Sequence, residues 1–99
     1  MTKKFRVTLY RRKGWLTLEL AGDTDGSSAA EICYYIETLG FRGCTLDFSR
    51  VRAIDVFAAR VLARGLRELR NRGVYFEVDG LTEAVAEKLC LGGVLEALV

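Results

Sequence analysis

Apolar and polar residues alternate in four stretches of the chain, and this period of two predicts β-strands with one buried face. The first two stretches are separated by the turn RRKG, in which Gly14 can adopt a positive φ angle, so they are expected to pair as an antiparallel hairpin. The apolar positions of the four strands are Phe5, Val7 and Leu9; Leu16, Leu18 and Leu20; Cys44, Leu46 and Phe48; and Val74, Phe76 and Val78.

Three segments with the apolar spacing of amphipathic helices lie between and after these strands. Each has a start signal, which is a side chain that accepts hydrogen bonds from free backbone N–H groups, and a glycine as a stop signal. The predicted signals are Ser28 (in a capping box with Glu31) and Gly40 for the first helix, Asp55 and Gly73 for the second, and Thr82 and Gly92 for the third. The last six residues, VLEALV, favour a short strand over a further helix.

The alternation within the strands also indicates how the layers are arranged. Strands covered on both faces read as continuous apolar runs, whereas these strands carry polar residues at alternate positions. All helices are therefore expected on one face of the sheet, with the other face largely open to water. The predicted fold is α/β, with a mixed sheet of four to five strands in the order β-β-α-β-α-β-α-β, in a single domain, 1–99. This arrangement argues against a doubly wound nucleotide-binding sheet.

Charge and apolar content narrow the class of function only a little. The net charge of +2 is too small to indicate nucleic-acid binding by itself. No apolar run is long enough to span a bilayer, and the N-terminal residues MTKKFRVTLYRRK lack the apolar core of a signal peptide. We therefore expect a cytoplasmic protein that neither inserts directly into a membrane nor binds nucleic acid.

The residue types and motifs that usually carry catalysis or hold cofactors are missing from the sequence. There is no histidine, which excludes Ser-His-Asp and Cys-His chemistry within this chain. No phosphate-binding glycine motif occurs, and the two registers of a calcium loop through residues 23–26 (DTDG) both lack the glutamate needed at loop position twelve. Cys33, Cys44 and Cys90 lie in apolar contexts and are expected to be buried, reduced thiols. We expect no enzymatic activity, no cofactor and no metal site.

The second predicted helix, residues 56–71, is the most informative part of the chain. Its core face is predicted to hold Ala58, Leu62, Gly65 and Leu69, with Leu66 at one margin. The opposite face holds Arg60, Arg64, Arg67 and Asn71. Gly65 is expected to let the helix approach the sheet closely. Val56 and Phe57 flank the head of the arginine stripe, and Phe57 is expected to be at least partly exposed.

Three interpretations of this outer face stay open. A solvated charged face would leave Phe57 folded against a neighbouring loop. A protein interface would use the aromatic side chain as an anchor beside the arginines, and a nucleic-acid surface would place the arginines on phosphates. Glu68 lies on the same face and aromatic residues are sparse there, so the pattern favours a protein-binding surface.

Nearly the whole sequence resembles the STAS domain family, whose name stands for sulphate transporter and anti-sigma factor antagonist. The motifs that carry the resemblance are residues 22–25 (GDTD, similar to GELD), 46–48 (LDF, similar to L-D-hydrophobic), 54–58 (IDVFA, similar to hydrophobic-D-S-S/T-G) and 91–95 (LGGVL, similar to a hydrophobic-x-G-hydrophobic segment). The resemblance implies a protein-interaction module that docks partners through the start of the long helix and its adjoining loop.

Two features depart from the pattern of that family. The serine or threonine that a partner kinase phosphorylates in the family falls on Phe57, which cannot be phosphorylated. Phosphorylation would add a charge of about −2 at this position, and that route of regulation is closed here. The family also adds a final helix after the last strand, whereas this sequence ends at Val99.

We therefore predict a non-enzymatic regulatory module that resembles an anti-sigma factor antagonist and lacks a phospho-switch at this position. The resemblance implies an anti-sigma factor of the kinase-like type, or a transporter ATPase, as the protein partner. A small-ligand-binding domain, a cytoplasmic subunit of a membrane transporter, and a homodimer formed through the open sheet face or Phe57 are left open. The predicted partner-binding residues are Asp25, Asp55, Val56, Phe57, Ala58, Arg60 and Arg64.

Overall fold

The computed structural model describes residues 5–98, and these fold in the order β-β-α-β-α-β-α-α. The elements are β1 (Phe5–Arg12), β2 (Trp15–Thr24), α1 (Gly26–Leu39), β3 (Gly43–Ile54), α2 (Val56–Asn71), β4 (Tyr75–Asp79), α3 (Glu83–Gly92) and α4 (Val94–Ala97). Each strand of the predicted alternation is present, and so is each of the three predicted helices. The α/β class is confirmed.

The sheet has four strands in the order β1-β2-β3-β4. The hairpin of β1 and β2 is antiparallel, as predicted, and its turn places Lys13 at φ 50° and Gly14 at φ 81°. Both angles suit the two-residue turn whose twist matches that of the flanking strands. Strands β2, β3 and β4 are parallel neighbours, so the helices between them return the chain to the same end of the sheet each time.

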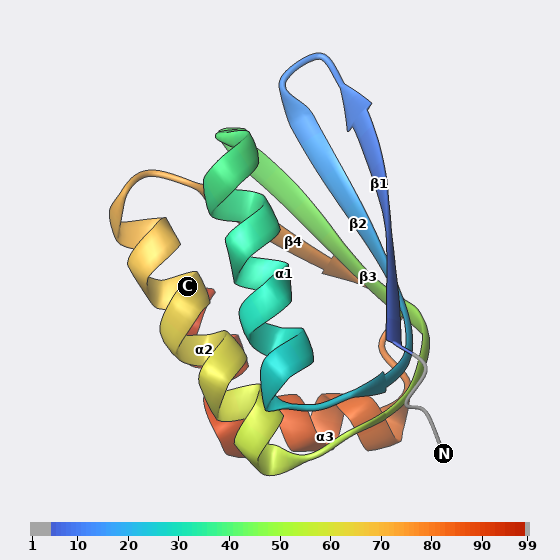
Figure 1. The fold of residues 1–99 in the computed structure, drawn as a ribbon. Coiled ribbons are helices and arrows are strands. Elements are labelled where there is room, and N and C mark those ends of the chain that lie inside the picture. Colours follow the sequence, from blue (N-terminus) through green and yellow to red (C-terminus); the bar gives the residue numbers. More distant parts are fainter. Residues whose placement is uncertain (1–4, 99) are drawn as a thin grey trace.

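The core lies between one face of this sheet and the helices. Leu16, Leu18 and Leu20 of β2 are fully buried on that face, as their alternation predicts. Figure 1 shows α1 and α2 side by side across the sheet, with α3 at the end where both helices begin. The predicted packing of the helices on one face is thus confirmed, and the carboxyl ends of β2 and β3 feed directly into the starts of α1 and α2.

The predicted last strand is wrong, because residues 94–97 form the short helix α4. Gly93 has φ 90°, a left-handed conformation that ends α3 and redirects the chain. Val94 and Ala97 are both buried, and their spacing of three places them on one side of a helical turn. Helix α4 packs against α2, so this segment completes the helix layer instead of the sheet. Val99 lies outside the described residues.

The start of α1 also differs from the prediction. Asp25, not Ser28, is the N-cap: its Oδ1 accepts hydrogen bonds from the backbone N–H and the hydroxyl of Ser28, each at 2.9 Å. Ser28 is buried within the first turn, so the capping box with Glu31 does not form. The N-caps Asp55 and Thr82 and the stop at Gly40 are confirmed, while α3 ends one residue later than expected, with Gly93 as its C-cap.

Gly65 allows a close approach, but to α1 and not to the sheet. A Cβ atom at position 65 would lie 2.3 Å from Sγ of Cys33, a distance that real side chains essentially never show, and 3.0 Å from its Cβ. Helices α1 and α2 therefore pack closely at Gly65, where the side chain of α2 is a single hydrogen atom. Leu66, predicted at the margin of the core face, is fully buried.

Candidate protein-docking surface

The starts of α1 and α2 lie side by side because the strands that precede them are paired. Thr24 at the end of β2 stands opposite Ile54 at the end of β3. The next residue in each chain segment is an aspartate that caps the following helix. Asp55 accepts a 2.7 Å hydrogen bond from the backbone N–H of Ala58, just as Asp25 does from Ser28. Each carboxylate lies at the positive end of a helix dipole, which stabilises its negative charge.

Phe57 connects these two helix starts. A Cβ atom built on Gly26 would lie 2.7 Å from Cε2 and 3.2 Å from Cδ2 of the Phe57 ring, so the ring edge rests on the backbone of Gly26. The side chain nevertheless remains 65% exposed. One side of the ring is held by α1 and the rest faces solvent. The predicted partial exposure of Phe57 is confirmed.

The arginines behind Phe57 are exposed along α2 and are not neutralised locally. Arg60, Arg64 and Arg67 are exposed. Among residues 5–98, the ion pairs with arginine are those of Arg50 with Glu19, Arg52 with Asp23 and Arg72 with Glu37, and none involves this stripe. The outer face of α2 therefore carries three arginines without an ion pair among the described residues, with Glu68 as an acidic residue on the same face.

Some of the predicted partner-binding residues have side chains that face solvent, whereas the others are buried or cap a helix. Phe57, Arg60 and Arg64 present exposed side chains, and the half-buried Val56 lies at the first position of α2. Ala58 is fully buried and belongs to the core, so its side chain does not reach the surface. Asp25 and Asp55 both serve as caps through the hydrogen bonds described above.

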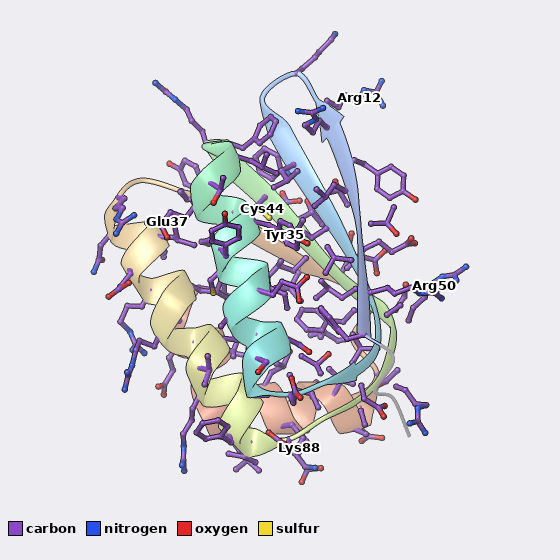
Figure 2. The ribbon with its side chains drawn as sticks, viewed as in Figure 1. Arg12, Tyr35, Glu37, Cys44, Arg50 and Lys88 are labelled. Atoms are coloured by element: carbon purple, nitrogen blue, oxygen red, sulfur yellow. The ribbon has the colours of Figure 1, made fainter. Side chains whose placement is uncertain are left out.

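Sequence reasoning missed the contribution of α3 to this surface. A Cβ atom on Gly92 would lie 2.3 Å from Cβ of Ala59 and 3.0 Å from the backbone nitrogen of Arg60. The end of α3 thus packs directly on the first turns of α2, and Leu91 beside it is 62% exposed. Figure 2 shows Lys88 of α3 at the same end of the molecule. The glycine pair at 92 and 93 was a signal for close packing, but nothing in the sequence identified α2 as its partner.

The three cysteines do not share one environment, contrary to expectation. Cys44 is buried and Cys33 is half-buried, but Cys90 is exposed on α3. Burial, together with the negative charges of Glu37 and Glu68, raises the pKa of the Cys33 thiol to about 11. Burial likewise raises the pKa of Cys44 to about 12. All three are free thiols, and Cys33 and Cys44 remain protonated at neutral pH.

Within residues 5–98, no helix combines the length and the apolar character needed to cross a bilayer. A cavity of about 440 Å³ lies where α1 and α2 end, away from Phe57. It is lined by residues that include Ile36, Phe41, Leu69 and Val74. This cavity therefore does not provide a small-molecule pocket at the start of α2.

Comparisons with known proteins bear on this arrangement. Residues 8–99 match the family described as Mlab, STAS domain. No curated protein sequence gives a match. Among solved structures, Mglu is 28% identical with a TM-score of 0.69, over 77% of this chain and 20% of the Mglu chain. The chain thus spans about a fifth of the length of Mglu.

Two smaller proteins are similar over more of their length. RsbS of Moorella thermoacetica, solved as a serine-to-glutamate variant, is 25% identical with a TM-score of 0.69, covering 89% of this chain and 78% of RsbS. An anti-sigma factor antagonist from Mycobacterium paratuberculosis is 16% identical with a TM-score of 0.76, covering 96% and 83%, and this likeness concerns the fold alone. With the family match over residues 8–99 and this shared arrangement of sheet and helices, the chain belongs to the STAS domain family.

Proposed function

We propose that this STAS domain is a non-enzymatic regulatory module that docks a protein partner through the start of α2. The observation that carries the proposal is the position of Phe57, which is 65% exposed while its ring edge is held against Gly26. An aromatic side chain fixed in this way loses little conformational freedom on binding and offers a large apolar area. Such rigid aromatic anchors, flanked by arginines, are characteristic of the residues that dominate binding energy in protein interfaces.

The charges around Phe57 indicate the chemistry of the partner. Arg60, Arg64 and Arg67 have no ion pair within the described part of the chain, and Glu68 is an acidic residue on the same face, so the arginines remain available to an acidic partner surface. Leu91, which precedes the Gly92 that packs on Ala59 of α2, adds an exposed apolar side chain at this end of the molecule. We propose a partner surface with an apolar pocket for Phe57 and carboxylates placed to pair with the arginines.

The same position also supports a proposal about regulation. In the proposed complex, Phe57 makes an apolar contact with the partner. A serine or threonine at this position could be phosphorylated to switch docking off, but a phenyl ring cannot be phosphorylated. Docking is then constitutive, or it is controlled somewhere other than position 57. The proposed partner class is an anti-sigma factor of the kinase-like type or a transporter ATPase, in the cytoplasm.

A photocrosslinking experiment tests the docking surface and identifies the partner class at once. A photoreactive phenylalanine analogue is placed at Phe57 in one protein and at Tyr34 in another. Tyr34 is a matched control because it is an aromatic residue of α1 with 62% exposure. We expect a specific crosslinked protein from position 57 and none of the same mass from position 34. Equal crosslinking from both positions, or from position 34 alone, contradicts the proposal.

The small-ligand alternative is tested separately. A ligand-binding STAS domain would need a pocket near the start of α2. One cavity of about 440 Å³ lies at the opposite end of that helix, and an open hollow of about 700 Å³ is lined by residues of α3 and α4 that include Glu87, Cys90 and Leu95. Native mass spectrometry of freshly purified protein distinguishes the two functions. We expect the mass of the bare chain, and a stoichiometric bound small molecule would favour the ligand function instead.

A further inference from the structure

The outer edge of β4 carries unpaired backbone groups in a regular row. Among residues 5–98, strand β4 is the last strand of the sheet and pairs with β3 alone. The backbone N–H of Tyr75 donates to the carbonyl of Arg42 at 2.8 Å, so the backbone groups of Tyr75 point toward β3. Because these groups alternate along a strand, the N–H and C=O groups of Phe76 and Val78 point away from the sheet. The segment predicted as an additional strand forms α4 instead and does not cover them.

The two edges of the sheet differ in how they are protected against pairing. Strand β1 carries Arg6, Arg11 and Arg12, and charged side chains of this kind discourage another strand from adding to an edge. Figure 2 shows Arg12 near the hairpin turn. Strand β4, with the sequence YFEVD, has no lysine, arginine or proline, and its register with β3 shows no bulge. The edge of β4 therefore lacks basic residues, proline and a bulge, and the charges that it carries, Glu77 and Asp79, would repel only an acidic strand.

The side chains of β4 specify what kind of strand would fit. Phe76 and Val78 pack against the core but remain half-buried, so apolar surface continues past the edge on the helix side. On the open face of the sheet, Glu77 and Asp79 are exposed. Asp79 also stands opposite Asp47 of β3, which adds to the negative charge of that face. Like-charged residues placed opposite each other destabilise strand pairing, whereas opposite charges stabilise it.

We propose that the outer edge of β4 binds an extended segment of a partner protein, which adds to the sheet as a further strand. This segment carries aliphatic residues that continue the layer of Phe76 and Val78, alternating with lysine or arginine beside Glu77 and Asp79. Backbone hydrogen bonds to Phe76 and Val78 supply affinity, and the alternating side chains supply specificity. A second copy of β4 fits less well, because an antiparallel pair centred on Glu77 places two glutamates opposite each other. This surface is separate from the start of α2.

Amide hydrogen exchange measured by NMR tests the proposal with a defined probe. The probe is a synthetic peptide that alternates lysine and valine, and its control alternates glutamate and valine. With the lysine peptide, we expect exchange at the N–H groups of Phe76 and Val78 to slow about tenfold or more, with little change along β1. Unchanged exchange at both residues, or equal binding of the glutamate peptide, would overturn the proposal.

Two variants keep the test independent of folding. Val78→Pro removes an outward N–H without removing a hydrogen bond to β3, and it should abolish peptide binding while circular dichroism stays native. If this variant does not fold, the surface variant Glu77→Lys/Asp79→Lys should reverse the preference toward the glutamate peptide. If the surface variant still prefers the lysine peptide, the proposal is contradicted. It is also contradicted if the protein without peptide forms a dimer in sedimentation and substitutions at the β4 edge abolish that dimer. Phe57→Glu should leave peptide binding unchanged, which separates this site from the docking surface on α2.

Discussion

The ring of Phe57 rests on Gly26, so that an added Cβ atom at position 26 would lie 2.7 Å from Cε2 of the ring. This contact joins the starts of two helices whose preceding strands are paired at Thr24 and Ile54. It places one edge of an otherwise exposed aromatic side chain against the backbone of α1. The contact therefore relates the fold, through the parallel pairing of β2 and β3, to the proposed docking function.

Gly26→Ala should change the position of the Phe57 ring more than it changes stability. The clash involves the far end of a side chain that can rotate, and alanine has a better helix propensity than glycine. We expect the free energy of unfolding to change by less than about 1 kcal/mol, whereas partner binding falls several-fold because the anchor has moved. Denaturant unfolding and NMR shifts of the Phe57 ring measure the two effects. Unchanged shifts would show that the ring does not depend on Gly26.

Asp55 is expected to act through its hydrogen bond to the N–H of Ala58 and not through its negative charge alone. Asp55→Ala removes an N-cap and should lower the free energy of unfolding by about 1 kcal/mol. Asp55→Asn keeps an acceptor oxygen and should retain most of that stability. Urea unfolding of the three proteins makes the comparison. A loss with asparagine as large as with alanine would mean that charge, and not capping, is the main contribution.

The packing of α1 on α2 at Gly65 should be sensitive to one added methyl group. Gly65→Ala places a carbon 2.3 Å from Sγ of Cys33, so we expect destabilisation by about 1–3 kcal/mol despite the better helix propensity of alanine. Cys33→Ala removes that sulfur, and the double variant should recover part of the loss. A double-mutant cycle measured by thermal or denaturant unfolding gives the coupling. Strict additivity of the two substitutions would refute this contact.

The three thiols should differ in reactivity. Cys90 is exposed, whereas burial raises the pKa values of Cys33 and Cys44 to about 11 and about 12. Because the thiolate is the reactive form, alkylation at pH 8 should label Cys90 first, with the other two reacting at least tenfold more slowly. Peptide mass spectrometry over a time course reads out each site. Equal rates at all three would contradict the burial of Cys33 and Cys44.

The raised thiol pKa values also predict how stability depends on pH. An unfolded cysteine ionises near pH 9, the ordinary value, while the folded Cys33 thiol ionises near pH 11. The contribution of the buried Cys33 thiol to the free energy of unfolding is thus fully present below pH 9. It is lost as the pH rises through about 11. The stability difference between the wild-type chain and Cys33→Ala should shrink over this range by up to about 2 kcal/mol.

The sequence predicted those features that depend on local patterns. The alternation of Leu16, Leu18 and Leu20 identified a strand, and Asp55 and Thr82 were recognised as caps because each stands just before a helical apolar pattern. At the start of α1 the capping-box spacing of Ser28 and Glu31 predicted the wrong N-cap, because Asp25 caps the helix instead.

The errors concern features that only tertiary packing decides. The segment of residues 94–97 is too short for the spacing of its apolar residues to distinguish a strand from a helix. It forms a helix because this conformation buries both Val94 and Ala97 against the helix layer. The helical wheel correctly placed Phe57 outside the core face of α2. It gave no information on Gly26, because that contact depends on how α1 and α2 are positioned relative to each other.

The central claim is tested most directly by capture of the partner with Phe57→Glu and Tyr34→Glu side by side. Glutamate near the N-terminus of α2 suits the helix dipole, so Phe57→Glu should remain folded, with a melting temperature close to that of the wild-type chain. We expect it to lose at least about tenfold in partner affinity, by removal of the apolar anchor and by added negative charge beside an acidic surface. Tyr34→Glu, altered at a residue of similar exposure on α1, should bind as the wild-type chain does. Equal partner recovery by folded Phe57→Glu and the wild-type chain would contradict the proposed docking surface.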